Sequence, residues 1–154
     1  MSALKAFQVA AELAERQRDA ARQALLDVQA AQRAAQAQLA QLTGYAGELQ
    51  GRWGMRADSV VQPEVMRHYY QFTGRLEQAM AMQANTLAGQ DTRVAQARQV
   101  LLQAELRLAS LAKVLERRRA ELALQQQRQE QKHTDERAAL RAGRARAGVL
   151  NQEN

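Results

Sequence analysis

A heptad repeat is the feature that most constrains the fold of this chain. Apolar residues alternate at spacings of three and four through roughly the first fifty residues. A second run with the same spacing extends from Met66 to Leu115 and can be continued through Arg118 to Leu122. A repeat of about 3.5 residues predicts helices that pair along a narrow apolar seam in a left-handed coiled coil.

Most positions of the predicted seam are apolar, and many are alanine, which lets helices approach closely but buries little area. In the first run the seam residues are Leu4, Phe7, Ala11, Ala14, Arg18, Ala21, Leu25, Val28, Gln32, Ala35, Leu39, Leu42, Ala46 and Leu49. In the second run they are Met66, Tyr69, Thr73, Leu76, Met80, Gln83, Leu87, Gln90, Val94, Ala97, Leu101, Ala104, Leu108, Leu111 and Leu115. We therefore expect pairing that is weak per turn and adaptable.

The composition favours an all-α fold. Ala and Gln contribute 32 and 23 of the 154 residues, and both prefer helices to strands. Aromatic content of 4% argues against an ordinary mixed core, and a single Pro leaves long helices uninterrupted. The absence of Cys excludes disulfides, iron–sulfur clusters and thiolate zinc sites. Neither a transmembrane helix nor a signal peptide is expected, because no long apolar run occurs.

A glycine-rich segment that ends at Pro63 separates the two runs and predicts a turn. Pro63 suits the first helical position, and the carboxylate of Glu64 suits the positive end of the helix dipole. One short connection predicts an antiparallel coiled-coil hairpin that forms a single domain over residues 1–154. Within it we expect a first helix over about 3–50, a turn over about 51–62, a second helix over about 63–142 and a frayed tail over 143–154.

The second helix is the longer one, so its last turns should extend beyond the paired region. Folding back near residue 57 places Leu4 near residue 110 and leaves residues 116–142 without a partner helix. Residues 111–154 hold ten basic and six acidic side chains, which gives +4 of the total net charge of +6. Such a basic region suits an acidic protein surface, nucleic acid or an acidic membrane.

No pattern in the chain indicates catalysis or a bound cofactor. The Gly cluster near residue 50 lacks the Lys-Ser/Thr step of a phosphate-binding loop. Glu130 and His133 have a spacing found in di-iron bundles, but such bundles need two copies of the motif and two further carboxylates. A hairpin of two helices also offers no enclosed pocket. We therefore expect a protein that is not an enzyme and holds no metal or cofactor.

Aromatic residues gather around the expected turn, where they could form a small core that closes the hairpin or a surface for a partner. The cluster comprises Tyr45, Trp53, Tyr69, Tyr70 and Phe72. Two stripes with helical spacing also flank the seam there, and they predict a docking face for another protein. These stripes consist of Gln38, Leu42, Tyr45 and Leu49 on the first helix and Phe72, Leu76, Ala79 and Gln83 on the second.

Several short motifs, by their order and spacing, resemble the FliJ family of the bacterial flagellar type III export apparatus. The resemblance runs from Leu4 to about Ala139, and its opening is similar to the family's Phe/Leu-rich start followed by Leu13–Ala14–Glu15. The family pattern Leu-x-x-Tyr, then Tyr-Gln-Phe-x-x-x-Leu-Glu-x-Ala, is matched by Leu42, Tyr45, Tyr70, Gln71, Phe72, Leu76, Glu77 and Ala79. The family ending Gln-Lys-x-x-Asp-Glu is matched by Gln131, Lys132, Asp135 and Glu136.

The resemblance implies a coiled coil similar to the gamma stalk subunit of rotary ATPases, with a binding region at each end. The two stripes near the turn would bind the cytoplasmic domain of the export gate, although Leu49 and Gln83 stand where the family can have Tyr and His. The end with both termini would enter the hexameric export ATPase and promote its assembly. The residues expected to contact that ring are Phe7, Leu13, Glu15, Arg117, Arg118, Arg119, Gln131, Lys132, Asp135 and Glu136.

The resemblance further implies binding of export chaperones and a peripheral location at the cytoplasmic face of the inner membrane. On the basis of the resemblance, neither nucleic-acid binding nor direct membrane insertion is expected. Three other interpretations remain open. The chain could be the stalk protein of a virulence injectisome or a generic coiled-coil scaffold, and its basic C-terminal third could bind nucleic acid.

Overall fold

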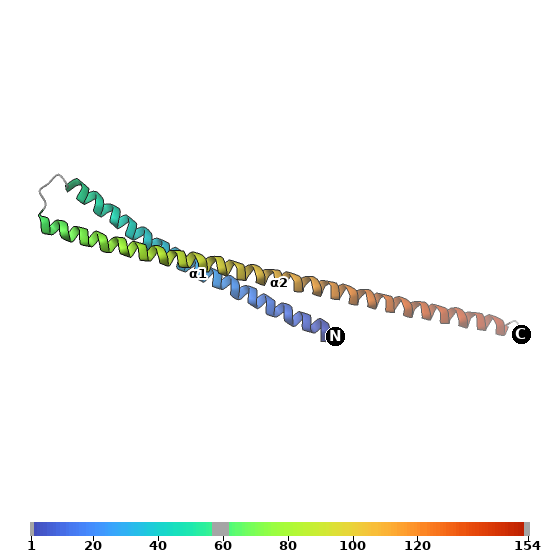
Figure 1. Ribbon diagram of the computed structural model, residues 1–154. Helices are drawn as coiled ribbons and strands as arrows, with labels where there is room; N and C mark the ends of the chain where they lie inside the picture. The colour runs from blue at the N-terminus through green and yellow to red at the C-terminus, as the bar shows by residue number, and fades with distance from the viewer. Residues whose placement is uncertain (1, 57–61, 153–154) are drawn as a thin grey trace. The chain divides into compact units, whose positions relative to one another are not determined.

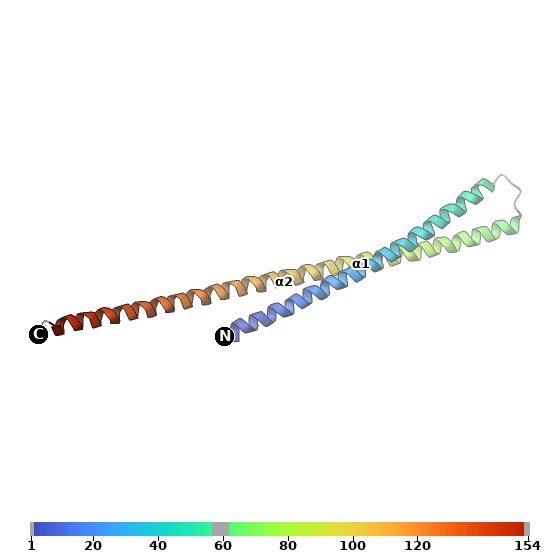
Figure 2. The same cartoon turned by 180° about the vertical axis from the view of Figure 1, so that it is seen from behind.

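The computed structural model describes residues 2–56 and 62–152 and contains two helices, α1 (Ser2–Arg56) and α2 (Pro63–Gln152). They are 55 and 90 residues long, and no strand occurs within the described ranges. The two helices pack against each other as an antiparallel hairpin (Figures 1 and 2). The expected all-α coiled-coil hairpin is thereby confirmed.

Packing contacts group the structure into two units. One unit joins Met1–Ala14 with Arg107–Asn154, and the other comprises Glu15–Leu106. Each unit contains a segment of α1 and a segment of α2. The expectation of a single domain over residues 1–154 stays a prediction.

The heptad seam is the contact surface between the helices. Every seam position expected from the sequence, from Leu4 to Leu49 and from Met66 to Leu115, is buried or half-buried. The most buried side chains all lie on the seam, and they are Ala14, Ala21, Ala35, Leu76, Val94 and Leu115. The proposed continuation of the seam fails, because Arg118 is exposed and Leu122 retains 41% of its accessible surface.

Within the Glu15–Leu106 unit, contacts between the helices follow one antiparallel register. Gln32 of α1 donates to Asp91 of α2, with 2.6 Å between Nε2 and Oδ1. Further along α1, the ring of Trp53 lies 4.8 Å from that of Tyr69, measured between centroids. The α2 partner number falls as the α1 number rises, as an antiparallel pair requires. Toward the connection the helices separate in both views (Figures 1 and 2), and there the ring of Trp53 packs on that of Tyr69 on the seam.

Polar residues on the seam mostly find partners. The guanidinium of Arg18 forms an ion pair with Asp19 at 3.0 Å. The amide of Gln83 reaches across to α1, while Thr73 donates its hydroxyl to the carbonyl oxygens of its own helix. The exception is Gln90, whose Oε1 is buried without a hydrogen-bond partner among the described residues. A buried acceptor without a partner lowers stability, but polar seam residues also help to fix the register of a coiled coil.

Both helices extend further than the sequence analysis predicted. Glycines were expected to end the first helix near residue 50, yet α1 continues to Arg56 and none of the described glycines has a positive φ. Long helices tolerate exposed glycine because its cost is only about 1 kcal/mol per residue. Likewise α2 continues through residues 143–152, where fraying was expected. Its start agrees with the prediction, and the amide of Met66 donates to the carbonyl of Gln62 in the first turn.

The two helices also pair differently from the expectation in the unit of Met1–Ala14 and Arg107–Asn154, because α1 ends later than predicted. Leu4 was expected near residue 110, and Phe7 would then lie nearer still to the start of α2. Phe7 instead packs on Arg118, about three helical turns further along α2. The segment of α2 expected beyond the pairing is exposed throughout, from Glu116 to the last described residue, Gln152, although Arg118 contacts Phe7.

Replacing a helical glycine should stabilise the hairpin. Gly89 lies mid-helix and exposed on α2, and a Cβ added there would meet nothing within 4 Å. We expect Gly89→Ala to raise the free energy of unfolding by about 0.5–1 kcal/mol, because alanine loses less backbone entropy on folding. Thermal unfolding followed by circular dichroism checks this. The neighbouring control Ala88→Gly should lower stability by a similar amount, and a loss of stability in Gly89→Ala would contradict the prediction.

Candidate functional site

The two stripes expected to form a docking face lie side by side in the structure. We call them together the turn-proximal face, which comprises Gln38, Leu42, Tyr45, Leu49, Phe72, Leu76, Ala79 and Gln83. The rings of Tyr45 and Phe72 meet edge to face, with centroids 6.1 Å apart and planes at 82°. One heptad further from the connection, Nε2 of Gln83 donates to Oε1 of Gln38 at 3.0 Å. Both contacts join α1 to α2, so the stripes form one continuous surface.

Burial divides this face into supporting and presented side chains. Leu76 is only 8% exposed, because it packs on the seam, whereas Tyr45 and Phe72 keep 49% and 43% of their surface. Gln83 is fixed by a second bond from Nε2 to the carbonyl oxygen of Ala35, also at 3.0 Å. The aromatic pair is therefore exposed beside a side chain that the seam buries.

A shallow hollow of about 380 Å³ lies on the turn-proximal face beside Tyr45. It is lined by Gln38, Gln41, Leu42, Tyr45 and Gln83. Gln41 was not among the predicted residues. Its position three residues after Gln38 places it on the same flank of α1, and this spacing could have identified it.

The aromatic residues near the connection divide into two groups on opposite flanks of the seam. Tyr45 and Phe72 belong to the turn-proximal face. Tyr70 is exposed on the other flank, and Tyr69 on the seam lies between Trp53 and Tyr70, at centroid distances of 4.8 Å and 5.7 Å. The cluster is thus in part a cap that closes the hairpin and in part exposed surface, which combines the two interpretations left open by the sequence.

A second hollow, of about 390 Å³, lies on that other flank and was missed by the sequence analysis. We call it the Tyr70 groove, and it is lined by Ala46, Gln50, Tyr69, Tyr70, Thr73, Leu76, Glu77 and Met80. Tyr70 and Glu77 are seven residues apart and share one side of α2. That spacing, together with Gln50 on α1, could have predicted the Tyr70 groove from the sequence.

Among the residues predicted to contact the ring, some contact each other within the chain and others are exposed. The guanidinium carbon of Arg118 lies 5.3 Å from the centroid of the Phe7 ring, which makes a cation–π contact within one unit. Arg117, Arg119 and Leu13 are exposed, and Leu13 keeps 50% of its surface. Glu15 is exposed on α1 and belongs to the Glu15–Leu106 unit. Arg118 is therefore engaged in holding Phe7, whereas its two neighbours face solvent.

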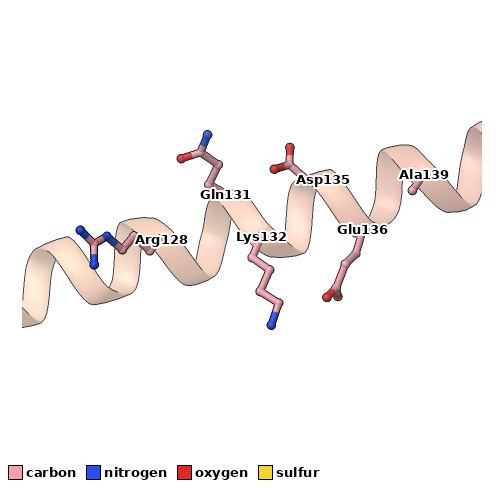
Figure 3. Close-up of a pocket in the computed structure, with 6 residues that line it drawn as sticks. All are labelled: Arg128, Gln131, Lys132, Asp135, Glu136 and Ala139. Atoms are coloured by element: carbon pink, nitrogen blue, oxygen red, sulfur yellow. The ribbon is translucent and has the colours of Figure 1, made fainter.

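The remaining four predicted residues lie on the exposed part of α2. Gln131 and Asp135 project from one side of the helix, and Lys132 and Glu136 project from the other (Figure 3). With Arg128 and Ala139 they line an open hollow of about 460 Å³ whose walls all come from α2. Such a hollow binds nothing by enclosure, so these residues can act only when a partner packs against the helix.

Neither metal chemistry nor a membrane span is indicated by the described part of the chain. No group of three or more His, Cys, Asp or Glu side chains there could hold a metal ion. No helix within residues 2–56 and 62–152 is long and apolar enough to cross a bilayer.

Comparison with known proteins identifies the family. The model of the family described as flagellar FliJ protein matches residues 4–147, which is nearly the whole chain. The chain therefore belongs to the FliJ family, whose members are non-enzymatic coiled-coil components related to flagellar type III export. No curated protein and no solved structure matches the chain.

The contact between Arg118 and Phe7 should protect the N-terminal turns from opening. A cation–π contact at an exposed site contributes about 0.5–1 kcal/mol, which corresponds to roughly a two- to fivefold change in an opening equilibrium. We expect Arg118→Ala to speed amide hydrogen exchange in residues 2–14 by about that factor. Arg119→Ala is the matched control, and equal exchange in the two variants would contradict an internal role for Arg118.

Proposed function

We propose that this FliJ-family chain is a stalk-like, non-enzymatic component that links the hexameric flagellar export ATPase to the export gate. The observation that carries the proposal is the turn-proximal face, where the two stripes from distant parts of the sequence form one surface. Its exposed centre is the edge-to-face pair of Tyr45 and Phe72, at 49% and 43% exposure. Aromatic residues on a rigid base are typical energetic centres of protein interfaces.

The turn-proximal face is the proposed binding surface for the cytoplasmic domain of the gate. Gln38 and Gln83 add polar groups beside the aromatic pair, and they are ordered by hydrogen bonds before any partner binds. Preordered side chains lose less entropy on binding than mobile ones. Leu49 is half-buried on the seam, so its replacement of a family Tyr removes a polar group at the margin of the face rather than its centre.

The opposite region is the proposed contact with the ATPase ring. There the N-terminal turns and the exposed part of α2 belong to one unit, in which Arg118 contacts Phe7. Beyond Leu115 none of the described residues of α2 is buried, so most of the surface of this segment, apart from the Arg118 contact with Phe7, is open to a partner. Its excess of basic side chains suits an acidic surface inside the ring, and charges of this kind mainly tune association rate and orientation.

The family further supports, as part of the same proposal, an escort role toward export chaperones. It also supports a location at the cytoplasmic face of the inner membrane, reached through the gate rather than by insertion of this chain. A generic scaffold would have no reason to combine an aromatic docking face in one unit with an exposed basic helix in the other. Copurification with the export ATPase and the gate domain distinguishes the two functions.

Truncating the aromatic centre should weaken binding to the gate. Phe72 lies off the seam, so Phe72→Ala should leave helix content unchanged and weaken binding of the gate cytoplasmic domain by about tenfold or more, as for an interface hot spot. Isothermal titration with the purified gate domain measures this. Tyr70→Ala, an exposed aromatic on the opposite flank, is the matched control. Equal affinity of wild type and Phe72→Ala would remove this face from the proposal.

Reversing the free arginines at the other end should impair action on the ATPase. We expect Arg117→Glu combined with Arg119→Glu to reduce stimulation of ATPase turnover and hexamer formation several-fold, most strongly at low salt, because exposed charges are screened. Arg118 is kept so that its contact with Phe7 survives. The control is Arg141→Glu combined with Arg144→Glu. It makes the same change in charge further along α2, outside the residues predicted to contact the ring. Full stimulation by the Arg117 and Arg119 variant would show that this segment does not contact the ring.

A further inference from the structure

The motif around residues 70–79 carries two residues that the turn-proximal face leaves unused. Tyr70 and Glu77 belong to the stretch that also contains Phe72 and Leu76, but they point to the other side of the seam and line the Tyr70 groove. Because α2 places residues 70 and 77 two turns apart on one side, about 10 Å separates their backbone positions. This flank has no role in the proposed gate binding, so a function of the groove is independent of that proposal.

Tyr70 forms a rigid and exposed wall of the groove. It keeps 65% of its surface, which is more than either Tyr45 or Phe72 keeps. Its ring is nevertheless braced edge to face by Tyr69 at 5.7 Å, and Tyr69 is braced by Trp53 at 4.8 Å. A tyrosine held in place offers a large contact area at little cost in conformational entropy.

The floor of the groove is apolar and requires no hydrogen bond from an occupant. Ala46 supplies the α1 side, and Leu76 and Met80 supply apolar surface from α2. The hydroxyl of Thr73 is already bonded to the carbonyl oxygens of Tyr69 and Tyr70, at 3.0 Å each. An apolar side chain can therefore enter without leaving a buried polar group unpaired.

The charge of the groove indicates the chemistry of its occupant. Among the described residues that line it, only Glu77 is charged, although the whole chain has a net charge of +6. The face of a tyrosine ring also attracts cations, so Tyr70 and Glu77 favour the same kind of side chain. Both lie at the rim, where they would meet the flanks of a helix whose apolar side covers the floor.

We propose that the Tyr70 groove is a second docking surface, which binds an amphipathic helix of a partner protein through an apolar side chain on the groove floor and a Lys or Arg beside Glu77. The hairpin thus carries two separate binding surfaces near its connection, one on each flank of the seam. Because the two surfaces share only Leu76, one partner can occupy each at the same time.

Two labelled peptides test the groove directly. One is a helical peptide with Leu on one side and Arg at its flanks, and the other is identical except that Glu replaces every Arg. Fluorescence anisotropy with the full chain should show binding of the basic peptide. Glu77→Lys should weaken that binding at least about tenfold and allow the acidic peptide to bind. Tyr70→Ala should also weaken it, whereas Phe72→Ala on the opposite flank should not.

All three substituted side chains are exposed, so the variants should fold, and circular dichroism confirms it before binding is measured. Three results would overturn the proposal. The first is failure of the basic peptide to bind, or equal binding of the two peptides. The second is a loss in Phe72→Ala as large as that in Tyr70→Ala. The third is self-association of the chain that Glu77→Lys abolishes, which would assign the groove to the basic α2 of a second copy.

Discussion

Burial of one narrow seam holds this protein together, and the rest of the structure depends on it. Two helices can bury only the side chains that face each other, and here the most buried of these include Ala14, Ala21 and Ala35. Small side chains allow close approach, but each contributes little apolar area. Stability must therefore accumulate along the length of the pairing, which explains why the seam persists from Leu4 to Leu49 and from Met66 to Leu115.

A two-helix architecture also determines where function can reside. Within residues 2–56 and 62–152 the buried side chains all lie on the seam, and almost every residue outside it is exposed. Binding surfaces must then form along the flanks, where side chains from both helices meet over a buried base. The pair of Tyr45 and Phe72 on one flank, and Tyr70 on the other, are both supported in this way by seam residues such as Leu76 and Tyr69.

The two units differ in physical character, because the helices are unequal in length. Near the connection, aromatic side chains fill the space between the helices and reach the surface. Beyond Leu115, the described part of α2 has no buried residue and carries basic side chains in excess. A helix of this kind gains little stability from packing, because α1 provides few contacts to it.

The sequence by itself determined the fold class, the seam and the two stripes of the turn-proximal face, because each follows from helical periodicity, which is local. It did not determine the end of α1, the pairing of Phe7 with Arg118 or the Tyr70 groove. In an alanine-rich seam, sliding one helix by a heptad still places apolar residues against apolar residues, so periodicity alone cannot select the register. The register is selected by contacts between distant residues, such as Gln32 with Asp91, Gln83 with Gln38 and Trp53 with Tyr69. Only the tertiary structure brings these residues together, and with them the walls of a groove built from both helices.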